Sequence, residues 1–131
     1  MTNKFNQLTV TALTVVTAIA SVISPAKADS EPTPDNLFMA DVINLSTAYS
    51  SSSSQAIMQA GRANVIQDGH HVCSKLDAGY SVKEIVNSAV EQMMQSGMSR
   101  QEFSEVWNPY FSAVLVSAIN HYCPQHSNLL Q

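Results

Sequence analysis

Basic residues and cysteines are scarce in this sequence. Six Lys and Arg stand against ten Asp and Glu among 131 residues, and the chain has only two cysteines and four glycines. The few basic residues form no cluster that could neutralise a row of phosphates. Nucleic acid and anionic membrane surfaces are therefore not expected as partners.

The sequence also lacks the short motifs that identify common catalytic sites. It contains no Gly-x-Ser-x-Gly elbow, no His-Glu-x-x-His pair and no glycine-rich phosphate loop. Glu84 and Glu102 lie three residues after Ser81 and Ser99, where they are expected to cap helices. We therefore expect no enzymatic activity and no cofactor.

Only one long apolar run occurs, the sixteen residues 8–23, and threonine and serine interrupt it. This run is short for a membrane-spanning helix, which needs about 20 residues. Lys4 precedes it and Ala26-Lys27-Ala28 follows it, which is the three-part pattern of a secretory signal peptide. No cysteine lies beside the cleavage site, so a lipid anchor is not expected. We predict that residues 1–28 are a signal peptide cleaved after Ala28 and that the mature chain is periplasmic or extracellular, without a membrane span.

The mature chain shows no sustained strand alternation, and its apolar residues recur at helical spacing. We predict an all-α fold, a small bundle of four to five helices held by one disulfide. Residues 29–36 hold two prolines and predict a flexible lead-in. The helical domain is placed at 37–126 and a C-terminal tail at 127–131.

Capping residues suggest where the helices begin and end. Thr33 is expected to cap a first helix whose first position is Pro34, and the five serines Ser50 to Ser54 predict a solvated loop after it. A second helix is predicted from about Gln55 to Ala78, followed by Gly79 in a left-handed turn. Gly61 and Gly69 within it mark either a break or a close approach of two helices.

Two serine caps predict the last two helices. A capping box at Ser81 opens a helix that ends near Gly97, and Ser99 opens a final helix that reaches Tyr122. Pro109 interrupts this final helix, which we expect either to kink there or to restart with Asn108 as its cap.

Export also determines the state of the cysteines. Two cysteines in a small protein of an oxidising compartment predict a disulfide, here between Cys73 and Cys123. The bond would close residues 74–122 into one loop and stabilise the fold by about 4 kcal/mol in the chain-entropy account.

The order of these residues resembles a known family, the small exported proteins of domain of unknown function 732. The resemblance covers most of residues 37–126. It rests on Phe38, Val65-Ile66, Gly69, Val72-Cys73, Leu76-Asp77-Ala78-Gly79, Ser81, Ala118 and Tyr122-Cys123-Pro124. It implies a signal peptide, a helical domain and a Cys73–Cys123 disulfide. It implies no activity, because none is established for the family.

All four histidines lie within three residues of a cysteine, and a disulfide would bring them into one neighbourhood: His70, His71, His121 and His126. With the cysteines they match the ligand types of a structural zinc site, but oxidised cysteines cannot serve as ligands, so no metal site is predicted. Two alternatives involve the histidines alone, a weak metal cluster or a pH sensor in which mutual repulsion near about pH 6 loosens the C-terminal helix. The simpler interpretation is that His70 packs and the others are solvated.

The aromatic residues gather in the final helix at Phe103, Trp107, Tyr110 and Phe111. They form either part of the core or the wall of an apolar ligand pocket. The leading functional hypothesis is an exported, non-catalytic module that binds a protein or cell-envelope component. The alternatives are an apolar-ligand carrier that uses the Trp107 region and an acid-responsive, chaperone-like periplasmic protein.

Overall fold

Six α-helices make up most of residues 31–131, the part of the chain that the computed structural model describes. They are α2 Pro34–Tyr49, α3 Ser53–Ala60, α4 Arg62–Asp77, α5 Val82–Gln95, α6 Arg100–Glu102 and α7 Asn108–His121. A π-helical turn, Phe103–Trp107, joins α6 to α7, and a 3-10 helix, Pro124–Leu130, follows α7. The all-α class is confirmed. The count exceeds the expected four to five because two predicted helices are each divided. The predicted signal peptide and its cleavage after Ala28 lie outside the described residues.

Both ends of the described region are more ordered in secondary structure than expected. The Thr33 hydroxyl accepts a hydrogen bond from the Asn36 amide at 3.3 Å, and Pro34 occupies the first turn of α2. The last three residues of the expected lead-in, 29–36, are therefore helical. Most of the expected tail, 127–131, belongs to the 3-10 helix. No helix within residues 31–131 is long and apolar enough to cross a membrane.

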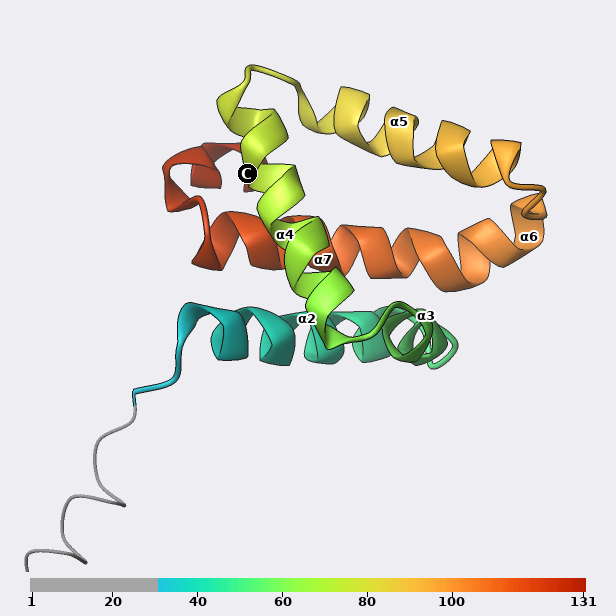
Figure 1. Cartoon of the computed structure of the whole chain (residues 1–131), viewed down its shortest axis with the longest axis horizontal. Coiled ribbons are helices and arrows are strands. Elements are labelled where there is room, and N and C mark those ends of the chain that lie inside the picture. The colour runs from blue at the N-terminus through green and yellow to red at the C-terminus, as the bar shows by residue number, and fades with distance from the viewer. Residues whose placement is uncertain (1–30) are drawn as a thin grey trace, which may run out of the picture. The chain divides into compact units, whose positions relative to one another are not determined.

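The core lies where α2, α4 and α7 meet. α7 packs most extensively on α2, and α4 crosses both of them (Figure 1). The largest fully buried apolar side chains are Phe38, Val42, Val65, Tyr110, Val114 and Ile119. Burial of each such side chain contributes about 1.5–3 kcal/mol, so these three helices carry most of the hydrophobic stabilisation.

The two glycines inside the predicted second helix do different things. Gly61 has φ +78° and ends α3, so it divides the predicted helix in two. Gly69 lies within α4 and allows α2 to approach. A Cβ atom at Gly69 would lie 2.6 Å from Cζ of Phe38 and 2.9 Å from Cε2 of Tyr122. The sequence offered a helix break and a close approach of two helices as alternatives. The break occurs at Gly61 and the close approach at Gly69.

The serine run between α2 and α3 is not the fully solvated loop that its composition suggested. Ser53 is completely buried, and its hydroxyl lies 2.6 Å from the carbonyl of Ser46 and 2.7 Å from that of Ser50. Ser46 is itself buried, and its hydroxyl donates to the Val42 carbonyl at 2.5 Å. These bonds satisfy hydroxyl groups that would otherwise be costly to bury, and the prediction of a plain solvated loop was wrong.

The final predicted helix is divided just before Pro109: α7 begins at Asn108 and holds Pro109 in its first turn, so Asn108 is a helical residue rather than the expected cap. The chain widens into the π-helical turn just before it, and the Asn108 amide donates to the carbonyl of Phe103. Because proline has no amide hydrogen, the carbonyl of Glu105 lacks its usual helical donor. The Ser50 hydroxyl donates to that carbonyl at 3.1 Å. A serine from the α2–α3 connection thus replaces the missing backbone bond.

Candidate functional site

Helix α5 packs on the core in an unusual way. It buries none of its residues completely, although its apolar side chains face α4 and α7. Figure 1 shows α5 running alongside α7, with α4 crossing near its start. Both ends of α5 are defined by local backbone structure. Gly79 and Gly97 both have positive φ and end α4 and α5, and the expected capping box starts α5 at Ser81.

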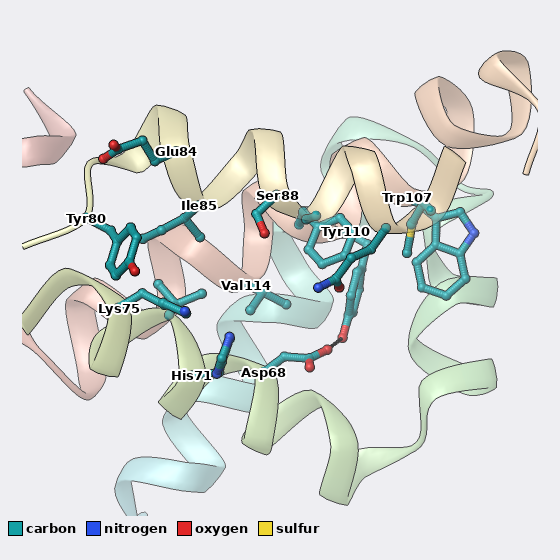
Figure 2. A pocket seen from close by; sticks show the side chains of 15 residues that line it. Asp68, His71, Lys75, Tyr80, Glu84, Ile85, Ser88, Trp107, Tyr110 and Val114 are labelled. Atoms are coloured by element: carbon teal, nitrogen blue, oxygen red, sulfur yellow. Dashed lines mark hydrogen bonds between the residues drawn. The ribbon is translucent and has the colours of Figure 1, made fainter. Parts of the chain in front are cut away.

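Two cavities lie beneath α5. The larger has a volume of about 410 Å³ and is bounded by α4, α5, the π-helical turn and α7 (Figure 2). The smaller, about 260 Å³, lies between α5 and the π-helical turn and α7. Both cavities are lined by Val72, Ile85, Ala89 and Phe111. We call the two cavities together the α5 cleft. The larger cavity alone reaches the size range of small-molecule sites, about 300–1,000 Å³.

The aromatic group that the sequence singled out lies on the walls of this cleft. Trp107, Tyr110 and Phe111 line the larger cavity, while Phe103 and Phe111 line the smaller. The Tyr110 ring stands edge-on to Trp107 at 5.6 Å and to Phe111 at 5.3 Å between ring centroids. Tyr110 is 1% exposed, so it belongs to the core as well as to the cavity wall. The alternatives of core and pocket are thus not exclusive.

Tyr110 is held by a carboxylate from α4. Its hydroxyl donates to Asp68 at 2.7 Å. Burial of the ring, and then this bond and the charge of Asp68, raise the pKa of Tyr110 well above its ordinary value. The phenol therefore stays neutral at any physiological pH. The bond fixes the Tyr110 ring against α4 and occupies one of the two carboxylates in the cavity lining.

The remaining charged groups of the larger cavity lie toward its α4–α5 end, whereas the uncharged Ser88 and Gln92 line it farther along α5. Nζ of Lys75 lies 4.7 Å from the centroid of the Tyr80 ring. The carboxylate of Glu84 accepts hydrogen bonds from the Ser81 amide at 2.7 Å and the Ser81 hydroxyl at 2.9 Å. These bonds lower the pKa of Glu84. Figure 2 shows Lys75, Tyr80 and Glu84 at one end of the cavity and Trp107 at the other.

Sequence reasoning missed most of this lining. It treated His71 only as part of a histidine group and did not consider Asp68 or Lys75 as site residues. A signal was available, because Asp68, His71, Val72 and Lys75 are spaced three, four and seven residues apart and share one helical face. The cavity itself had no signal, because the apolar stripe of α5 resembles that of a fully packed helix.

The disulfide joins Cys73 of α4 to Cys123, just past the end of α7, with 5.8 Å between their Cα atoms. The predicted pairing is confirmed. An open groove of about 600 Å³ lies beside it and is lined in part by Asp35, His70 and Tyr122. The Tyr122 hydroxyl donates to Asp35 at 2.6 Å, and its ring stacks on His70 at 4.0 Å. Burial and the bond to Asp35 raise the pKa of Tyr122.

The histidines near the disulfide do not form a single cluster. Three of them pair with three different aspartates: His70 with Asp35 at 3.8 Å, His121 with Asp41 at 2.5 Å, and His126 with Asp77 at 2.8 Å. The bond from His126 lowers the pKa of Asp77. His71 instead lines the α5 cleft. Within residues 31–131 no group of three or more His, Cys, Asp or Glu side chains is arranged to hold a metal ion.

Comparison with known proteins finds one family. The model of the family described as "Protein of unknown function (DUF732)" matches residues 45–125, which is more than half of the chain. The match includes both cysteines and all the helices around the α5 cleft. No curated protein and no solved structure matches the chain.

Proposed function

The chain belongs to the DUF732 family, and we propose that it is an exported, non-catalytic protein that binds an apolar ligand in the α5 cleft. The family carries no established activity, so the proposal depends on the geometry of this chain. It makes the second of the three sequence hypotheses, the apolar-ligand carrier, the leading one.

The observation that carries the proposal is the incomplete packing of α5. Protein interiors are normally close-packed, and voids larger than a water molecule are few. Beneath α5, by contrast, mainly apolar side chains line two adjoining spaces of about 410 Å³ and 260 Å³ that are partly open to solvent. A ligand with an apolar body would bury these exposed surfaces and gain about 25 cal/mol for each Å² removed from water.

Export and the absence of catalysis have separate support. The N-terminal sequence has the pattern of a signal peptide, and a disulfide persists mainly in oxidising compartments. A carboxyl group acts as general acid or base only where it is free to exchange a proton with a substrate. Asp68 and Glu84, the carboxylates that line the larger cavity, each accept hydrogen bonds from within the protein.

The single tryptophan supplies a direct test. Because Trp107 lines the larger cavity and the chain has no other tryptophan, its fluorescence should report occupancy. We expect a neutral apolar dye such as N-phenyl-1-naphthylamine to bind saturably, with one dye per protein and energy transfer from Trp107.

Two variants of α5 make the test specific. Ala89 lines both cavities, so Ala89→Phe should fill the space and abolish dye binding. Asn87→Phe places the same ring at an exposed position outside the lining and should bind the dye like the unaltered protein. Equal dye binding by both variants, or no saturable binding by the unaltered chain, would contradict the proposal.

A protein or envelope partner is the second candidate. It is favoured by two large apolar side chains on neighbouring helices, Tyr49 of α2 at 70% exposure and Met58 of α3 at 75%. A double variant, Tyr49→Ser with Met58→Ser, should lose a partner captured by the unaltered mature protein and keep dye binding in the α5 cleft. Capture that is unchanged by these substitutions would exclude this surface.

The acid-responsive hypothesis has less physical support. It depends on repulsion between protonated histidines, but three of the four face aspartates, which would compensate their charge. Unfolding measured from pH 7 to 4, beside a variant with all four histidines replaced, would test it. Identical pH profiles would dismiss it.

A further inference from the structure

The α5 cleft has a polar end and an apolar end, and we propose that its ligand is an anionic amphiphile whose head is bound by Lys75 and whose chain lies beneath α5. This inference rests on the function proposed above and adds the chemistry of the ligand. A single-chain lipid with a carboxylate head is the simplest molecule of this kind.

Lys75 is an exceptional residue in this chain. Beyond residue 28 the sequence has only four Lys and Arg residues against ten acids, and Lys75 is the only one of the four in the lining of either cavity. It forms no ion pair with any residue of 31–131. Its charge is instead placed over the face of the Tyr80 ring, at the rim of the larger cavity. Lys75 is half-buried as a residue, and an ammonium group without a carboxylate partner is suited to an anionic ligand group.

The acids of the lining do not neutralise Lys75 directly. Figure 2 shows the Asp68 carboxylate directed at the Tyr110 hydroxyl, and that of Glu84 turned away from the cavity, where it meets Ser81. His71, which lies one turn before Lys75 in α4, is the one histidine with no aspartate partner among the described residues. A negative head at this end would therefore find Lys75 and a His71 ring as its available donors.

The other end of the cavity suits an apolar chain. From Lys75 the space passes between Ile85 of α5 and Val114 of α7 to the aromatic wall at Trp107 (Figure 2). The smaller cavity adjoins it and is almost wholly apolar in its lining. The one Lys or Arg of the lining thus lies at one end of the cleft, and the space beyond it is lined mainly by apolar side chains, with Ser88 and Gln92 as uncharged polar exceptions. A symmetric apolar molecule would leave Lys75 unused.

Three ligands with the same hydrocarbon chain and different head groups distinguish the contribution of the head to binding affinity from that of the chain. Binding of oleate, oleyl alcohol and oleylamine, each below its aggregation concentration, would be followed by Trp107 fluorescence and calorimetry. Because a charge-assisted hydrogen bond contributes about 1.5–3 kcal/mol, oleate should bind about tenfold or more tightly than the alcohol. Oleylamine should bind most weakly. Lysophosphatidylglycerol presents a phosphate instead of a carboxylate, and its affinity relative to oleate identifies the source of the negative head.

Substitution of the two lysines gives the matched control. Lys75→Met keeps the aliphatic stem and should remove the preference for oleate while leaving alcohol binding unchanged; Lys75→Arg should keep the preference. Lys83→Met, at an exposed site of α5 outside the lining, should have no effect. Equal affinities for oleate and alcohol in the unaltered protein, or a preference that survives Lys75→Met, would overturn the role of Lys75 and leave the apolar site standing. Failure of all three ligands and of the neutral dye would instead overturn the proposed function.

Discussion

The close approach of α2 to α4 at Gly69 makes a quantitative prediction for Gly69→Ala. The new Cβ would lie 2.6 Å and 2.7 Å from two ring atoms of Phe38 and 2.9 Å from the Tyr122 ring. Neither ring can move away easily, because Phe38 is completely buried and Tyr122 is bonded to Asp35 at 2.6 Å. Overpacking of this kind costs about 1–3 kcal/mol, whereas the better helix propensity of alanine returns about 1 kcal/mol. The expected net destabilisation is up to about 2 kcal/mol.

Urea unfolding of the oxidised mature protein, followed by circular dichroism, would measure this loss. For a domain of this size the urea midpoint should fall by up to about 1 M with an unchanged slope. Phe38→Leu removes the two ring atoms nearest to the new Cβ, so Gly69→Ala should cost about 1 kcal/mol less in that background. A higher midpoint for Gly69→Ala in the otherwise unaltered chain would refute the close approach, because only the propensity gain would then be present.

Three further predictions concern the disulfide, the serine run and the capping box. Replacement of Cys73 and Cys123 by alanine should lower the free energy of unfolding by about 4 kcal/mol in the chain-entropy account, since the bond spans 50 residues; a loss below about 1 kcal/mol in urea unfolding would show that the loop is already restrained. Ser53→Ala should cost about 1–2 kcal/mol through its two carbonyl contacts. By contrast, Ser51→Ala, at an exposed serine, should change the urea midpoint little. The bonds from Ser81 lower the pKa of Glu84 below its ordinary 4.5, so their stabilisation is present above that pH and is lost as pH falls through the lowered pKa; an NMR titration midpoint for Glu84 at or above 4.5 would contradict the capping box.

Features encoded by a few neighbouring residues could be predicted from the sequence. The Thr33 and Ser81 caps and the positive-φ glycines that follow α4 and α5, Gly79 and Gly97, depend on local backbone chemistry. The disulfide could be predicted because a chain with two cysteines has only one intramolecular pairing.

Features that depend on distant partners could not be predicted. The Tyr122–Asp35 bond joins residues 87 apart in sequence, and the Tyr110–Asp68 bond joins residues 42 apart. Ser53 resembles any loop serine until the fold places the carbonyl of Ser46 beside it.

The candidate site shows the same limit most clearly. The aromatic residues of the cleft were identified, because aromatic side chains at helical spacing must lie either in a core or around a cavity. Periodicity also gave α5 an apolar face toward its neighbours. It could not show that α5 stops short of complete burial, since that depends on how α4 and α7 meet beneath it. Lys75 became a candidate site residue only because it lines the larger cavity beneath α5.

Photocrosslinking with a fatty acid that carries a diazirine in its chain would test most directly whether the α5 cleft holds an apolar chain. The labelled positions are read by peptide mass spectrometry of the mature, oxidised protein. The cleft predicts adducts on α5 and α7, at residues such as Ile85, Ala89 and Phe111, and their loss in the presence of excess oleate. Adducts centred on Tyr49 and Met58, or labelling that excess oleate does not reduce, would contradict binding beneath α5.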